Sequence, residues 1–154
     1  MAVENYQRSG AESNSGVGRD FEETARLYFE SSGIRLNRGF SVPVGLGTKS
    51  KPHKFDFGSE NPPMLRECKS HKWTAGDNVP SAKITVWNES MYLFHLAPAK
   101  FRKILFVLRD YSERRGETLA EYYARSCGHL VPDGVEIIEY DEESGTAREV
   151  VPKD

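Results

Sequence analysis

The uninterrupted apolar run Ile104–Leu108 constrains the fold more than any other segment of the chain. A strand without polar residues at alternate positions is buried on both faces, so helices must cover both sides of its sheet. A chain of 154 residues with 38% hydrophobic content suits one compact domain with a sizeable core. We therefore expect a single mixed α/β domain.

Hydrophobic periodicity and breaks at glycine and proline divide the rest of the chain into helices and strands. The expected helices run from Asp20 to Gly33, from Ser81 to Leu96 and from Glu117 to Cys127. The expected strands are Ile34 to Val44, His53 to Gly58, Met64 to Ser70, Ile104 to Leu108 and Val135 to Tyr140. Two alternatives stay open: the start of the second helix also suits a strand, and residues 141–151 either close a hairpin or trail away.

Side chains within these helices have expected structural roles. Asp20 and Glu23 have the spacing of a capping box, which leaves Glu22 as a spare carboxylate. In the second helix, the apolar and aromatic residues are expected in the core. These core candidates are Ile84, Trp87, Met91, Tyr92 and Phe94.

The first 18 residues are rich in Ser, Gly, Asn and Glu, so we expect a flexible tail at 1–18 and a single domain at 19–154. No apolar run reaches the length of about 18 residues that a membrane-spanning helix needs, and the N-terminus has no apolar signal region. We expect a cytoplasmic protein without a membrane partner, associated with the nucleoid if the source is bacterial. Cys68 and Cys127 lack metal-ligand spacing and are expected to be reduced.

Asp56, Glu67 and Lys69 are expected on one face of a strand pair. If the turn is centred on Asn61-Pro62, Asp56 lies opposite Glu67, and Lys69 joins them by the two-residue period of a strand. Opposed like charges are destabilising unless a cation lies between them. A divalent ion bound by both carboxylates is one solution, and a pair of solvated surface acids is the other.

The charge of the chain is unevenly distributed. Its net charge is −2, but residues 49–72 hold six Lys or Arg side chains against three acidic ones. Phosphate backbones are bound by such local clusters whatever the total charge, although a solvated face explains the cluster equally well.

These segments resemble the PD-(D/E)XK nuclease superfamily, the restriction-endonuclease-like fold, in the order helix, three strands, helix, strand, helix, strand. The resemblance covers roughly residues 18–140. It rests on Gly18–Glu22, similar to the Gly-x-x-Phe-Glu helix start of Mrr-like members, and on Asp56 and Glu67-Cys68-Lys69 in successive strands. Phe55 stands where the family name has proline. The resemblance implies a mixed β-sheet flanked by helices on both faces.

The resemblance also implies roles for individual residues. The implied ligands of Mg²⁺ or Mn²⁺ are Asp56, Glu67 and the backbone carbonyl of Cys68. Lys69 would orient or help deprotonate the attacking water, and Glu22 would be an outer ligand, replaced by Glu23 if the helix register shifts by one. Possible substrate contacts are Lys54, His71, Lys72 and Lys83, each of which is otherwise an ordinary surface residue. His53 is expected to be an exposed strand-end residue.

The leading functional interpretation is a metal-dependent endonuclease that hydrolyses phosphodiester bonds in DNA, restriction-like or resolvase-like, acting on double-stranded or branched DNA, with a homodimer as a possible assembly. The alternative is a catalytically inactive protein of the same fold that binds nucleic acid or serves as an accessory subunit. A small adaptor unrelated to nucleic acid is a third interpretation. An adaptor is expected to hold at least one of Asp56, Glu67 and Lys69 in a salt bridge.

Overall fold

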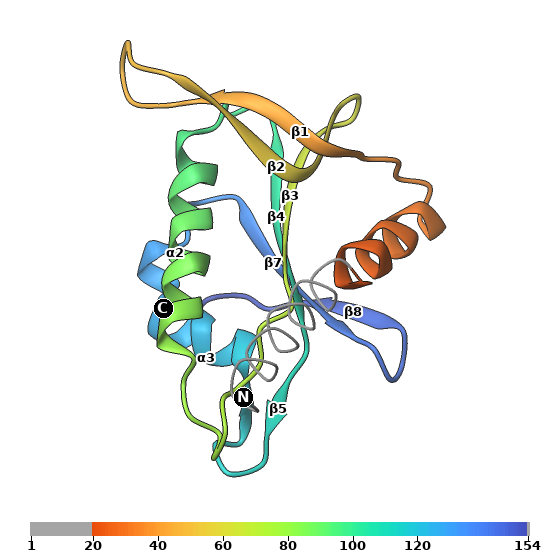
Figure 1. Ribbon diagram of the computed structural model, residues 1–154, viewed down its shortest axis with the longest axis vertical. Coiled ribbons are helices and arrows are strands. Elements are labelled where there is room, and N and C mark those ends of the chain that lie inside the picture. Colours follow the sequence, from red (N-terminus) through yellow and green to blue (C-terminus); the bar gives the residue numbers. More distant parts are fainter. Residues whose placement is uncertain (1–19, 154) are drawn as a thin grey trace, which may run out of the picture.

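A six-stranded mixed sheet with the order β1-β2-β3-β4-β7-β8 forms the centre of the computed structural model, which describes residues 20–153 (Figure 1). Its strands are β1 (Asn37–Val44), β2 (Lys51–Glu60), β3 (Pro63–Lys69), β4 (Arg102–Leu108), β7 (Val135–Asp141) and β8 (Thr146–Glu149). The central strands β3, β4 and β7 are parallel, whereas β1, β2 and β8 pair antiparallel with their neighbours. The tail predicted at residues 1–18 lies outside the described residues.

Helices cover both faces of this sheet (Figure 1). Helices α2 (Ser81–Leu96) and α3 (Leu119–Ser126) pack on one face, and the first helix, residues 20–31, packs on the other. Successive residues of β4 alternate between the two cores, with Leu105 facing the α2 side and Phe106 facing the first helix. The prediction that Ile104–Leu108 forms a strand buried on both faces is therefore confirmed, as is the α/β class.

Helix α2 has the predicted bounds, and the alternative strand at its start is wrong. Its core side chains also lie where the periodicity places them; the buried ones are Ile84, Trp87, Ser90, Met91 and Phe94. Tyr92 is the exception, because it is 53% exposed. Position 92 follows Met91 by about 100° around the helix and so turns away from the sheet.

The capping box predicted at the start of the first helix is wrong. Asp20 already has helical geometry, and the Glu23 carboxylate accepts hydrogen bonds from Arg26 and from Arg38 of β1. The predicted stop is confirmed, since Gly33 has a left-handed φ of 79° that favours glycine. Glu23 is therefore paired with these two arginines and does not cap the helix.

The C-terminal third of the chain differs from the prediction at the start of α3. Glu117 and Thr118 form the short strand β6 (Glu117–Thr118), paired with β5 (Tyr111–Ser112), and Thr118 then caps the helix. Its side chain and that of Glu121 make a reciprocal capping box. The terminal hairpin, left open by the sequence, forms between β7 and β8. None of the helices in residues 20–153 has the length and apolar character needed to cross a bilayer.

Gly58 of β2 is a point of close packing in the sheet. A Cβ atom added there would lie 2.7 Å from Cγ and 2.8 Å from Cβ of Phe40 in β1. Replacing Gly58 with alanine is therefore expected to lower the free energy of unfolding by about 1–3 kcal/mol, measured by urea denaturation. The same substitution made in a Phe40→Ala background should cost less, because the contacts with the ring are gone and only the 2.8 Å contact with Cβ remains. Equal costs in both backgrounds would contradict this explanation.

Candidate active site

The predicted site lies where the pairing of β2 with β3 ends. Phe57 pairs with Arg66 in the last pair of the two strands, so the predicted pair of Asp56 and Glu67 lies just beyond the ladder. Asp56 leaves this ladder: its Oδ2 accepts a hydrogen bond from the main-chain N–H of Cys68 at 2.8 Å. In a strand the N–H and C=O of one residue point to the same edge, so the Cys68 carbonyl also faces the β2 side.

Glu67 is a buried carboxyl, not a solvated surface acid. Only 6% of the residue is exposed. Burial and the neighbouring Asp56 carboxylate raise the pKa of Glu67 to about 9, and Lys69 offsets part of this effect. Glu67 is consequently protonated near neutral pH when no cation is present.

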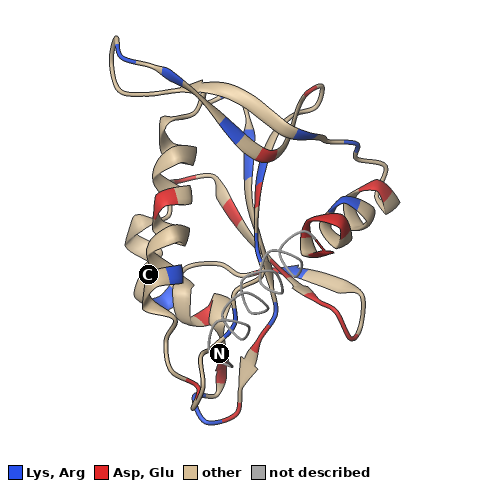
Figure 2. Ribbon diagram, viewed as in Figure 1, with Lys and Arg blue, Asp and Glu red and all other residues tan. Residues whose placement is uncertain are grey.

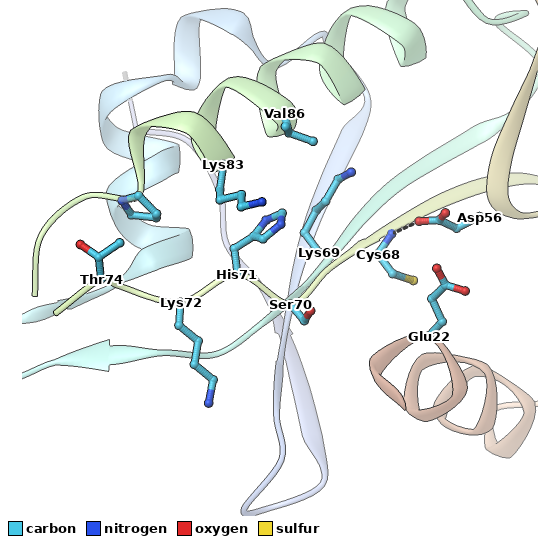
Figure 3. Close-up of a pocket in the computed structure, with 11 residues that line it drawn as sticks. Glu22, Asp56, Cys68, Lys69, Ser70, His71, Lys72, Thr74, Lys83 and Val86 are labelled. Atoms are coloured by element: carbon cyan, nitrogen blue, oxygen red, sulfur yellow. Dashed lines mark hydrogen bonds between the residues drawn. The ribbon is translucent and has the colours of Figure 1, made fainter. Parts of the chain in front are cut away.

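Glu22 approaches the two strands from the first helix. It lines a cavity of about 720 Å³ together with Asp56, Cys68 and Lys69, and its carboxyl points toward Asp56 and Cys68 (Figure 3). Burial and the charge of Asp56 raise the pKa of Glu22. Glu22, and not Glu23, is thus the carboxyl on the site side of the helix.

The predicted substrate contacts fall on two sides of Asp56. His71, Lys72 and Lys83 line the same cavity as Lys69. Lys54 does not: it lines a smaller recess of about 220 Å³, next to Asp56 on the β1 side. The basic stretch at residues 49–72 therefore spreads over β2, β3 and the loops beside them, interleaved with acidic positions (Figure 2).

Helix α2 faces this cavity with its N-terminal end. Pro80 and Lys83 line the cavity, and the first turn of the helix holds no acidic residue. The partial positive charge of this helix end therefore adds to the charge of Lys83.

Two residues near the site have positions that the sequence did not indicate. His53, expected at an exposed strand end, is half-buried against Phe55, and its Nε2 lies 3.6 Å from Oε1 of Glu67.

Arg66 is fully buried, with its guanidinium 4.1 Å from the ring centre of Phe29 and 4.3 Å from that of Phe57. Its three nitrogens have no hydrogen-bond partner within residues 20–153, and burial lowers its pKa. Alternation along β3 places Arg66 on the face opposite Glu67, which is the one signal in the sequence for this arrangement.

The oxygen groups of Asp56, Glu67 and Cys68 are of the chemical type that a hard divalent cation binds. No group of three His, Cys, Asp or Glu side chains in the described part of the chain is arranged to hold an ion. Two carboxylates and one carbonyl are nevertheless available from Asp56, Glu67 and Cys68, and Mg²⁺ is usually held by one or two carboxylates with water completing its shell. The raised pKa of Glu67 reflects burial first and the Asp56 carboxylate second, and the charge of Lys69 offsets these effects only in part. Cys68 and Cys127 are free thiols.

Comparison with known proteins adds no relative. No protein-family model, curated protein or solved structure matches the chain. The function is therefore inferred from the order of the elements and from the site residues themselves.

Proposed function

We propose that this protein is a metal-dependent nuclease that hydrolyses phosphodiester bonds in DNA, built on the restriction-endonuclease-like fold. The observation that carries the proposal is that Asp56 and Lys69 line a cavity of about 720 Å³ where β2 and β3 separate. Glu67 does not line this cavity, but it lies close enough to Asp56 and Lys69 for both charges to shift its pKa. Two acids and one ammonium around a space of this kind suit cleavage of a phosphate ester.

The arrangement of the chain supports the fold assignment. The described residues follow the order helix, three strands, helix, strand, helix, strand, with the small β5–β6 pair inserted before α3. The first helix brings Glu22 to the site from the face opposite α2, as the outer-ligand role of this residue requires (Figure 3).

Two of the three central residues, Asp56 and Lys69, lack the salt bridge that the adaptor interpretation allows for, whereas Glu67 has a contact with His53. Within residues 20–153, neither Asp56 nor Lys69 takes part in a salt bridge, and Oε1 of Glu67 lies 3.6 Å from Nε2 of His53, a contact that is ionic only when both groups are charged. An adaptor without a ligand would gain stability by pairing these charges with one another or with neighbours.

Each residue has a defined chemical task in the proposed reaction. Asp56, Glu67 and the Cys68 carbonyl would hold Mg²⁺ or Mn²⁺, which when bound supplies a Lewis acid for the phosphate and lowers the pKa of a bound water. The Lys69 ammonium orients the attacking water and offsets the negative charge that develops on the phosphate in the transition state. Glu22 holds a further water at the edge of the site.

The substrate is proposed to be double-stranded or branched DNA. Lysines on the α2 side of the cavity suit the phosphate backbone, whose binding is mainly electrostatic. A single site of this size acts on one strand, so cleavage of both strands of a duplex would use a homodimer with two-fold symmetry.

The proposal is tested by incubating the purified protein with supercoiled plasmid and with a branched DNA in Mg²⁺, Mn²⁺ or EDTA. We expect cutting that requires the ion and stops in EDTA. No cutting with either ion, combined with no metal binding by calorimetry, would overturn the catalytic assignment. Binding of DNA without cutting would then favour the inactive, nucleic-acid-binding alternative.

A further inference from the structure

His71 is held in one tautomer by a buried partner. Its Nδ1 lies 2.8 Å from Nε1 of Trp87, which is fully buried in the core beneath the cavity. An indole N–H can only donate, so the ring nitrogen that faces it must be unprotonated. The proton of the neutral imidazole is therefore on Nε2.

The Nε2–H group of His71 is open to the cavity. His71 lines this cavity, and its Nε2 has no hydrogen-bond partner within residues 20–153. The Nε2 atom is also not fully buried, so a ligand in the cavity can reach it. Burial, together with the charges of Lys69 and Lys83, lowers the pKa of His71 to about 4. The ring is accordingly a neutral donor near neutral pH.

The cavity has an acidic end and a basic end. Glu22 and Asp56 lie beyond Cys68 on one side of Lys69, whereas His71 and Lys83 lie on the other side (Figure 3). A cation held at the acidic end leaves the basic end free for an anion. A neutral donor between two lysines provides a directed hydrogen bond without adding a third positive charge.

We propose that the basic end is a second phosphate subsite, in which His71 donates its Nε2–H to an oxygen of the phosphate next to the one that is cleaved. Lys83 balances the charge of this phosphate, and Trp87 is a positioning residue that fixes the imidazole tautomer. This inference rests on the proposed nuclease function, since it assigns the substrate a second anchored phosphate.

The tautomer and the subsite are tested together by ¹⁵N NMR of the histidine side chains in EDTA, with inorganic phosphate as the probe. We expect the bare nitrogen of His71 at Nδ1 and the protonated one at Nε2 near neutral pH, and a shift of the Nε2–H signal as phosphate is added. His95 and His129, outside this cavity, are the controls and should not shift. A protonated Nδ1, or a phosphate titration that leaves His71 unmoved, would overturn the inference.

A variant separates failure of the subsite from failure of the nuclease. His71→Ala is expected to weaken phosphate binding by about tenfold, the effect of one hydrogen bond, whereas Lys100→Ala should not change it. Phosphate binding at His71 in a protein that cuts no DNA would refute the nuclease and keep the subsite. Normal phosphate binding by His71→Ala in a protein that cuts DNA would refute the subsite and keep the nuclease.

Discussion

Replacing Lys69 with alanine is expected to lower metal-dependent cleavage of plasmid DNA by at least about a hundredfold, the usual effect of removing one group that stabilises transition-state charge. The fold should persist, because Lys69 lies at the end of β3 and makes no salt bridge within residues 20–153. The measurement is the initial rate of plasmid nicking at saturating Mg²⁺, with circular dichroism as the check on folding.

Lys100→Ala is the matched control for this experiment. It removes the same charge from an exposed surface position, where Lys100 pairs with Glu60 away from the cavity. Its rate should stay close to that of the wild-type protein, since an exposed ion pair contributes little. Equal losses in both variants would mean that Lys69 acts only through general attraction of DNA, and full activity of Lys69→Ala would remove this residue from the mechanism.

Replacing Glu67 with glutamine is expected to stabilise the metal-free protein by about 1–3 kcal/mol near pH 9, because it removes a buried carboxylate beside Asp56. The folded-state pKa of about 9 lies above the ordinary value of 4.5. Protonated Glu67 therefore contributes stability that is fully present below pH 4.5 and is lost as the pH rises through about 9. The measurement is the free energy of unfolding of both proteins, obtained by urea denaturation at a series of pH values in EDTA.

The expected result is that the difference in free energy of unfolding between Glu67→Gln and the wild-type protein grows with pH. Wild-type protein should lose stability relative to Glu67→Gln across this interval, and Glu60→Gln, at an exposed position, should follow the wild-type curve. Mg²⁺ should stabilise the wild-type protein more than Glu67→Gln, since the ion binds the ionised carboxyl of the folded state. Parallel pH curves for wild type and Glu67→Gln would show that Glu67 is ionised in the folded protein.

Much of the fold could be predicted because its signals are local. The apolar periodicity of Ser81–Leu96, followed by Pro98, was sufficient for both ends of α2. The start of α3 was missed because Thr118 pairs with Tyr111 of β5 before it caps the helix, and no local pattern reports that pairing. The capping box was misassigned because Asp20 already has helical geometry and Glu23 bonds Arg26 of the same helix and Arg38 of β1.

The site was predictable in its residue types but not in its electrostatics. Strand alternation and the turn at Asn61-Pro62 predict Asp56 opposite Glu67. The paired register stops one residue earlier, at Phe57 and Arg66, and the Asp56 side chain instead accepts a hydrogen bond from the main chain of Cys68. The burial of Glu67 depends on how the helices and neighbouring strands pack around β3, and the spacing of residues in the sequence does not predict this packing. The bond between His71 and Trp87 joins a loop to a helix sixteen positions away, so the sequence offered no reason to couple them.

The aromatic enclosure of Arg66 affects the local stability of the first helix. Phe29 forms one wall of this enclosure, so the helix keeps away from water a guanidinium that has aromatic contacts but no hydrogen-bond partner within residues 20–153. Lifting the helix would let Arg66 regain its hydration, which offsets part of the apolar contact that is lost. Residues 20–31 should thus undergo local unfolding at a lower free energy than the sheet, with faster amide hydrogen exchange. Each such opening would also carry Glu22 away from the other carboxyl groups.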